Sequence, residues 1–213
     1  MRNIKKGPEP PSLTAWRNIN PTDYNGYRDK DTLRAMLIEE QRGICCYCEC
    51  RLYAAWNLMK VEHWHSHENY PTERLVYRNL LGACLGGIGT PGRDQHCDTA
   101  KGEQNLSRNP ADPTHDVEVL LRYRTDGKIT STNAQFDEEL NTVLKLNQPF
   151  LMNNRKAVLD GLKEALRIRG GTLTKAKWQN ILNDWNGSNY QADLRPYCSV
   201  IVYWAMKHLA KVS

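Results

Sequence analysis

The sequence contains no long apolar run. None of its 213 residues lies in a stretch near the roughly 20 apolar residues that a membrane-spanning helix needs, and the mean hydropathy is −0.68. The opening MRNIKKGPEPPSL has no apolar core behind its charges, so we do not expect a signal peptide. Internal repeats and low-complexity tracts are also missing. We therefore expect a cytoplasmic protein with no membrane segment, long enough for one domain and an appended part.

Charge of one sign is also scarce. Lysine and arginine number 29 and aspartate and glutamate 24, which gives a net charge of +5 and a pI near 8.8. This small basic excess permits a polyanionic partner such as nucleic acid but does not identify one. The charged residues are spread along the chain and form no element that would distinguish DNA from RNA.

Cysteine, in contrast, occurs seven times. In a chain without a signal peptide this number favours reduced thiols or metal ligands over a disulfide framework. Cys45 and Cys48 follow a predicted helix that ends at Gly43, which is how a zinc knuckle presents two thiolates from a tight turn. Cys84 and Cys97 can complete a four-thiolate tetrahedron. We therefore predict a structural Zn²⁺ held by these four cysteines.

Other ligand sets remain open at this point. The second cysteine pair is separated by the residues from 85 to 96, which is wider than a second knuckle would be. Cys46 and Cys50 compete with the first pair, and His96 could replace Cys97 as the fourth ligand. The same cysteines could also be buried, reduced thiols without a metal.

Periodicity and turn residues predict the elements around these cysteines. Residues 1–30, rich in Pro, Asn and Gly, are expected to form an extended arm. A helix should run from Asp31 or Thr32 to Gly43. The further expected elements are a hairpin of 51–59 with 60–67, a short helix or turn at 74–83, a glycine-rich loop at 85–95, a helix at 98–104, a hairpin at 117–130 and helices at 136–146, 153–168, 174–185 and 194–209.

Glu62 and His63 lie between the two cysteine pairs. On a strand such neighbours point to opposite sides unless the backbone bends, so one can hold a metal while the other approaches a water. An exposed Glu-His dipeptide without a role is the alternative. His65 follows at strand spacing and could contact phosphate, or it could lie in a solvated loop.

Three further polar residues complete the set. Asn79 can hydrogen-bond across a turn, or it can serve only as a helix cap. Asp98 and Lys101 lie one turn apart on one helix face, where a carboxylate can ligate Mg²⁺ and an ammonium can meet a phosphate. An ordinary i,i+3 ion pair is the alternative.

The order of these residues resembles the HNH, or ββα-metal, endonucleases of the zinc-containing kind. Their pattern is Cys-x-x-Cys, an acid-His pair, Asn, and Cys-x-x-Cys-Asn-x-x-Lys. The resemblance implies that Glu62 and Asp98 bind a catalytic Mg²⁺ or Mn²⁺, that His63 is the general base and that Asn79 holds the loop. This chain departs from the pattern because Glu62 stands where Asp is commoner, Asp98 replaces Asn or His, and a glycine-rich loop divides the second cysteine pair.

A closer resemblance covers most of the chain. The opening MRNIKKGPEPPSL, the GICCYCE segment, VEHW, YRNLLGAC and HCDTAKG look like the PtuB proteins, the HNH subunits of Septu anti-phage systems and of the retrons that encode the same pair. The resemblance implies a role in phage defence and a partner, the ABC-type ATPase PtuA. In a retron setting that partner would connect the chain to a reverse transcriptase–msDNA complex.

We therefore expect an α+β fold with a zinc-stabilised ββα nuclease core within residues 1–130 and a helical lobe from 131 to 213. The expected reaction is phosphodiester hydrolysis, with His63 deprotonating a water. Lys101, with Arg93 in the neighbouring loop, would meet backbone phosphates. The competing hypotheses are a non-catalytic zinc module that binds nucleic acid or the ATPase, and a redox sensor that uses the thiols near Cys45.

Overall fold

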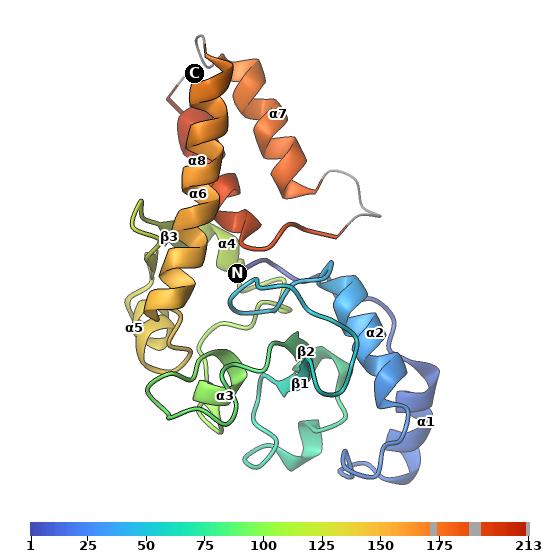
Figure 1. The fold of residues 1–213 in the computed structure, drawn as a ribbon. Coiled ribbons are helices and arrows are strands. Elements are labelled where there is room, and N and C mark those ends of the chain that lie inside the picture. Colours follow the sequence, from blue (N-terminus) through green and yellow to red (C-terminus); the bar gives the residue numbers. More distant parts are fainter. Residues whose placement is uncertain (171–173, 188–192, 212–213) are drawn as a thin grey trace.

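The computed structural model describes residues 1–170, 174–187 and 193–211. These residues form a mixture of helices and two small antiparallel sheets (Figure 1). The strands are β1 (Lys60–His63) paired with β2 (Leu80–Ala83), and β3 (Leu121–Tyr123) paired with β4 (Ile129–Ser131). The α-helices are α1 (Pro11–Ile19), α2 (Lys30–Glu40), α3 (Cys97–Lys101), α4 (Val117–Leu120), α5 (Ala134–Thr142), α6 (Pro149–Arg169), α7 (Lys175–Asn186) and α8 (Cys198–Leu209), and the 3-10 helices are η1 (Pro71–Glu73) and η2 (Tyr77–Asn79).

The N-terminal arm is packed against the protein instead of lying loosely on it. The Ile4 side chain is buried, and its backbone N–H donates to the Pro110 carbonyl at 2.7 Å. Helix α1, which the sequence did not lead us to expect, begins at Pro11, where the missing N–H and fixed φ of proline suit a first helical position. The arm therefore brings Lys6 beside the small sheet, where its ammonium donates to the Leu80 carbonyl at 3.0 Å.

The first sheet pairs different segments from those that the sequence predicted. Residues 54–58 form a bend and a turn, and Arg51 bridges back to Ile44, so the predicted hairpin of 51–59 with 60–67 is wrong. Strand β1 instead pairs with β2, which lies where a helix or turn was expected. All four residues of β2 are buried. Such a short, wholly apolar run has no alternation, and for that reason its period cannot reveal a strand.

The glycine-rich segment between β2 and α3 is a loop, as predicted. Gly86 adopts φ +58°, and a Cβ there would lie 2.2 Å from the His96 carbonyl oxygen. The His96 N–H donates to the Gly86 carbonyl at 2.9 Å and closes the loop. Because the loop closes, the start of α3 returns to the end of β2. The units β1, β2 and α3 thus lie together below the longer helices (Figure 1).

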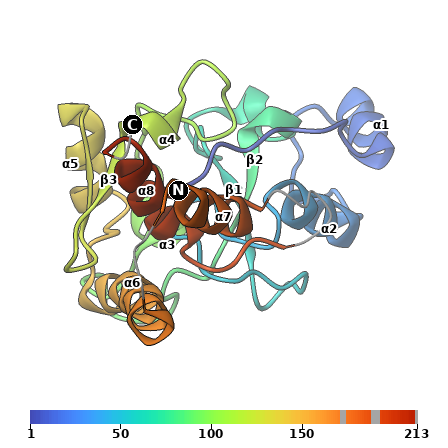
Figure 2. The ribbon, with the colours of Figure 1, turned by 90° about the horizontal axis from the view of Figure 1, so that it is seen from above.

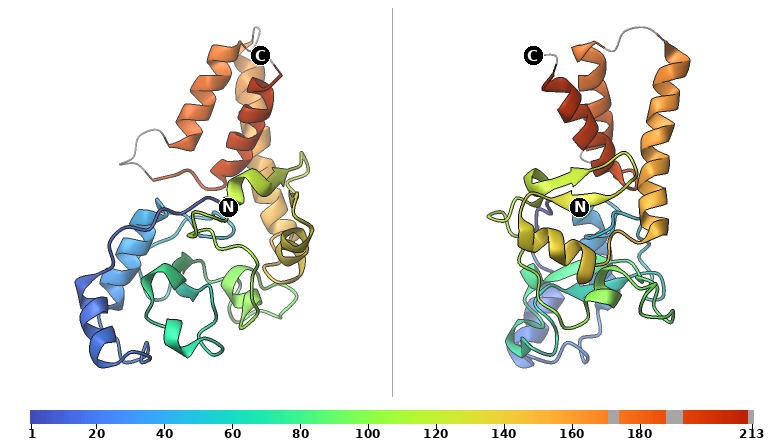
Figure 3. Two further views of the ribbon diagram at one scale, coloured as in Figure 1. Left: turned by 180° about the vertical axis from the view of Figure 1, so that it is seen from behind. Right: turned by 90° about the vertical axis from the view of Figure 1, so that its left-hand side faces the viewer.

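The remaining predicted elements are present with shifted bounds. The 117–130 hairpin begins later, because Val117–Leu120 is the helical turn α4. The four predicted helices correspond to α5, α6, α7 and α8, and the Thr174 side chain caps α7 by accepting from the Lys177 N–H at 3.3 Å. Helices α6, α7 and α8 project from the rest (Figure 3), and α7 lies beside α8 (Figures 2 and 3).

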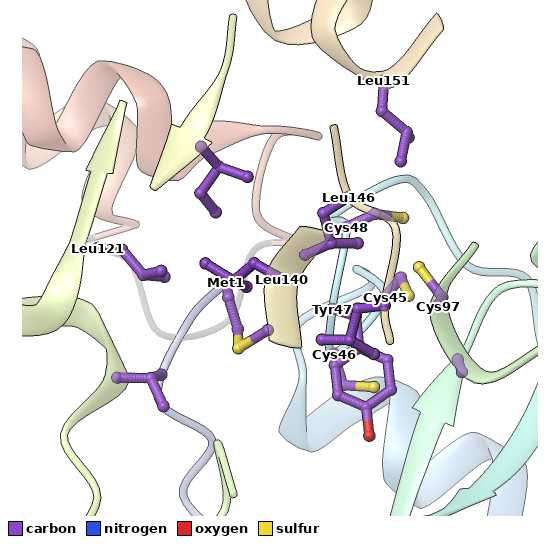
Figure 4. Packing of buried hydrophobic residues seen from close by; sticks show 14 of the residues in the cluster. Met1, Cys45, Cys46, Tyr47, Cys48, Cys97, Leu121, Leu140, Leu146 and Leu151 are labelled. Carbon is purple, nitrogen blue, oxygen red and sulfur yellow. The ribbon is translucent and has the colours of Figure 1, made fainter. Parts of the chain in front are cut away.

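The largest hydrophobic cluster includes the four cysteines that are predicted to bind zinc, and its members range along the sequence from Met1 to Ile201 (Figure 4). It therefore contains residues from both sides of position 130, and the division of the chain into two domains there stays a prediction. Among the described helices, none combines the length and the apolar character required for crossing a bilayer.

Candidate functional site

Four cysteine thiols converge between α2, β2 and α3. Their Sγ atoms all lie within 4.8 Å of one another, and all four residues are buried. The Sγ atoms of Cys48 and Cys84 are 3.7 Å apart. Zn–S bonds of about 2.3 Å place sulfurs about 3.8 Å apart at the corners of a tetrahedron. The predicted set of Cys45, Cys48, Cys84 and Cys97 is thus a cluster that could hold a metal such as zinc.

Local backbone geometry presents these thiols. Cys45 and Cys48 lie in a turn closed by hydrogen bonds from the Cys45 N–H to the Cys50 carbonyl (2.9 Å) and from the Glu49 N–H to the Cys45 carbonyl (3.1 Å). Glu49 and Cys97 both adopt positive φ, at 66° and 54°, which is unusual for residues with a Cβ. In Figure 4 the sulfur ends of Cys45 and Cys97 point toward each other. The turn and the start of α3 are therefore shaped around the cluster.

His96 lies at the edge of this cluster. Its Nδ1 is 3.2 Å from the Cys97 Sγ and 3.9 Å from the Cys84 Sγ. Contact with Cys45 acts to raise the pKa of Cys84, but contacts with Cys48 and other thiols outweigh it and lower that pKa to about 6. Since Cys97 belongs to the converging group of thiols and His96 contacts that group from outside, the geometry favours Cys97 as the fourth ligand.

The alternation of strand β1 separates Glu62 from His63. Lys60 and Glu62 share one face of the strand and His63 lies on the other, as strand geometry requires without a bend. Glu62 is 1 % exposed, and its Oε1 accepts from the Tyr47 hydroxyl at 2.6 Å and from the Lys101 ammonium, 3.1 Å away. The pKa of Glu62 is raised well above its usual value, mainly by burial and next by the neighbouring Asp98.

Asp98 meets Glu62 from the first turn of α3. The two carboxyl groups are hydrogen-bonded to each other, and the Lys60 ammonium forms an ion pair with Asp98 Oδ2. Burial acts to raise the pKa of Asp98, but the hydrogen bond from Glu62 and the Lys60 charge outweigh burial and lower it. Of the two groups, Asp98 therefore keeps its negative charge more readily. Two neighbouring carboxyl groups offer the oxygen donors that Mg²⁺ or Mn²⁺ takes.

His63 is fixed on the opposite face. Its Nε2 lies 3.0 Å from the Arg74 carbonyl, and its ring packs edge-on against Tyr24 (4.6 Å between centroids) and His67 (5.1 Å). Because a carbonyl only accepts, Nε2 carries the proton and Nδ1 keeps a lone pair. Burial lowers the pKa of His63 to about 4, so the imidazole is neutral at neutral pH.

Asn79 joins the two ends of the segment between β1 and β2. Its Oδ1 accepts from the His65 N–H at 2.7 Å, and its Nδ2 donates to the carbonyls of His65 (2.9 Å) and Glu73 (3.2 Å). The Trp64 N–H donates to the Asn79 carbonyl at 2.9 Å. These bonds hold the backbone directly after His63.

The three residues expected to meet phosphate lie in different surroundings. The Lys101 side chain is only 1 % exposed, and its ammonium donates to the His63 carbonyl at 3.0 Å, so it supports β1 from inside and does not face solvent. Arg93 is exposed in the glycine-rich loop. His65 bonds Glu73 at 2.8 Å and stacks on Tyr70. Phosphate contacts by these residues stay predictions, and for Lys101 the burial argues against one.

The sequence patterns did not indicate two residues of the site. Tyr47 lies inside the Cys-x-x-Cys turn, and its hydroxyl reaches Glu62. Lys60 lies two residues before Glu62 and so shares its strand face. The period of two along β1 could have indicated Lys60, whereas nothing local indicates where the Tyr47 hydroxyl points.

Comparison with known proteins gives one informative match. No protein-family model matches the chain. The chain is 30% identical over 129 residues to the Septu protein PtuB of Bacillus thuringiensis, a match that includes 58% of this chain and 44% of that protein. This chain therefore spans less than half the length of that relative. The match confirms the resemblance that the motifs indicate: over this stretch the chain is similar to a PtuB-type Septu protein.

Proposed function

We propose that this chain is a metal-dependent endonuclease of the HNH type, which hydrolyses phosphodiester bonds of nucleic acid in anti-phage defence together with a PtuA-type ATPase. The observation that carries the proposal is the meeting of Glu62 with Asp98 on one face of the β1–β2–α3 unit, with a neutral, oriented His63 on the adjacent strand position. The similarity to a Septu protein supports the defence role and the partner.

The chain's own groups have separate tasks in this proposal. Glu62 and Asp98 would hold a divalent ion, which would supply positive charge to the phosphate and the leaving oxygen. Nδ1 of His63 would accept the proton of the attacking water, since its partner Nε2 is fixed to the Arg74 carbonyl. Because the two groups lie on opposite faces of β1, a phosphodiester that meets both must lie across this strand.

The cysteine cluster has a structural task in the same proposal. A Zn²⁺ held by four protein thiolates has no open position for water or substrate, so it would not take part in the reaction. A zinc ion at the cluster would fix the positions of both carboxyl groups, because Tyr47 bonds Glu62 and Cys97 immediately precedes Asp98.

A non-catalytic zinc module that binds nucleic acid or the ATPase is the second candidate. It is favoured by one observation: the two carboxyl groups are already in contact with the ammonium groups of Lys60 and Lys101. Such a module would bind its partner with Glu62 and His63 replaced, and it would cleave nothing.

The experiment that separates the two candidates is a substrate screen. The zinc-loaded chain, alone and with its PtuA-type partner, is incubated with plasmid DNA and with total RNA in Mg²⁺, Mn²⁺ or EDTA. The nuclease proposal predicts cleavage of at least one substrate in a divalent ion and none in EDTA. Retained binding without cleavage in every condition would contradict the proposal and support the binding module.

A further inference from the structure

The carboxyl pair of the candidate metal site has its own counter-ions. The Lys60 ammonium contacts Asp98 Oδ2, and the Lys101 ammonium lies 3.1 Å from Glu62 Oε1. Two carboxyl groups thus face two ammonium groups. A divalent cation that approaches this pair meets no excess of negative charge, so one of the two ammonium groups has to leave before the ion can bind well.

The two lysines differ in how firmly they are held. The Lys101 side chain is 1 % exposed and its ammonium also donates to the carbonyls of His63 (3.0 Å) and Gly102 (3.4 Å). The Lys60 side chain is 32 % exposed, and beyond Asp98 its ammonium donates to the Thr99 hydroxyl at 3.1 Å. Moving Lys101 would leave the buried His63 carbonyl without this donor, whereas Lys60 can turn into water at little cost.

Lys60 also occupies the solvent side of the pair. Asp98 keeps 16 % of its side chain exposed, whereas Glu62 keeps 1 %. An ion arriving from solvent therefore reaches Asp98, the carboxylate that Lys60 contacts, before it reaches Glu62. The same side is the one from which a phosphate would approach an ion bound by the two carboxyl groups.

We propose that Lys60 is an internal cation of this site, which neutralises Asp98 in the absence of a divalent ion, releases it when the ion binds, and then contacts a phosphate of the nucleic acid. This inference rests on the proposed function, because it takes Glu62 and Asp98 as the carboxylates that hold the catalytic ion. Its consequence is that the site is loaded with metal most readily when a phosphate is present to receive the released ammonium.

The test measures Mn²⁺ binding by calorimetry to the zinc-loaded chain without nucleic acid. Lys60→Met keeps the length of the side chain and removes its charge, so it should bind Mn²⁺ about five-fold more tightly than wild type, equivalent to about 1 kcal/mol. Lys60→Arg keeps the charge and is the matched control, with an affinity near that of wild type. Asp98→Asn removes a ligand and should bind Mn²⁺ more weakly than all three.

A second measurement follows the released ammonium. In a His63→Ala background, which prevents cleavage, binding of a short DNA duplex is measured at several salt concentrations. With Mg²⁺ present, adding Lys60→Met should reduce the slope of log affinity against log salt by about 0.9, the value of one phosphate contact. Without Mg²⁺ the slope should not change, because Lys60 then contacts Asp98.

The outcomes separate this inference from the proposed function. Equal Mn²⁺ affinity of Lys60→Met and wild type, with weaker binding by Asp98→Asn, would overturn the role of Lys60 and leave the metal site intact. Equal binding by Asp98→Asn and wild type, or none by any protein, would overturn both. If Lys60→Met does not retain its zinc, Lys60→Gln provides the same comparison.

Discussion

The Tyr47 hydroxyl donates a hydrogen bond of 2.6 Å to Glu62 Oε1, and this bond joins the cysteine turn to the carboxyl pair. Tyr47 lies between Cys45 and Cys48 and is 1 % exposed. The residues of the candidate metal cluster and those of the candidate active site are thus in direct contact. A substitution in the cysteine turn should therefore change the geometry of the carboxyl pair, and the reverse.

Removing the Tyr47 hydroxyl should weaken the fold without removing the zinc. Tyr47→Phe leaves Glu62 with Lys101 and Asp98 as partners, so we expect a loss of about 1 kcal/mol in the free energy of unfolding. Denaturant unfolding measures it, with Tyr53→Phe on an exposed ring as the matched control. A Tyr47→Phe protein as stable as the control would show that this bond contributes nothing.

The cysteine cluster predicts the metal content. Purified protein should contain close to one zinc per chain, and Cys48→Ser should lose the zinc and unfold, since structural zinc sites contribute about 10 kcal/mol or more. Elemental analysis and circular dichroism measure the two effects. Cys198→Ala, in a buried cysteine of α8 outside the cluster, should keep its zinc. A folded, zinc-free Cys48→Ser protein would remove the metal from the account.

The hydrogen bonds of Asn79 predict a local effect. Asn79→Ala leaves the His65 N–H and two carbonyls without their partner, so we expect a loss of about 2 kcal/mol in the free energy of unfolding and faster tryptic cleavage at Arg74. Asn105→Ala, at an exposed position, is the control. Unchanged proteolysis in Asn79→Ala would contradict the view that this side chain holds the segment after β1.

Burial of His63 predicts a pH dependence of stability. Its pKa falls from 6.5 to about 4 on folding, so the unfolded chain binds more protons between these values and stability is lost as the pH falls through this window. Between pH 7 and pH 5 this group should remove about 2 kcal/mol from the free energy of unfolding. The measurement compares wild type with His63→Gln at both pH values. An equal pH dependence of the two proteins would mean that His63 is not buried as a neutral ring.

Part of the site could be predicted from the sequence. The spacing of Cys45 and Cys48 predicted a knuckle, and the resemblance to the HNH pattern implied that Glu62 and Asp98 lie at one site. The opposed directions of Glu62 and His63 follow from the period of a strand. The knuckle and the strand alternation depend on local geometry, which residue spacing indicates directly.

Features that depend on tertiary packing could not be predicted in the same way. The partner of β1 lies beyond the segment that Asn79 closes, and β2 has no alternation to reveal it. Lys101 looks like a surface cation on a short helix, and only the docking of α3 against β1 buries it. Helix α1 was missed because prolines dominate its start, although Pro11 suits a first helical position.

The central claim is that His63 is the general base of a nuclease, and the rate of cleavage by His63→Ala tests it most directly. On the nucleic acid that wild type cleaves fastest, His63→Ala should lose on the order of 10²–10⁴-fold in rate, and excess Mn²⁺ should not restore it. Glu62→Ala should also be slow but partly restored by Mn²⁺, and His208→Ala, on α8, should match wild type. Cleavage at the wild-type rate by a folded, zinc-loaded His63→Ala protein would contradict the account.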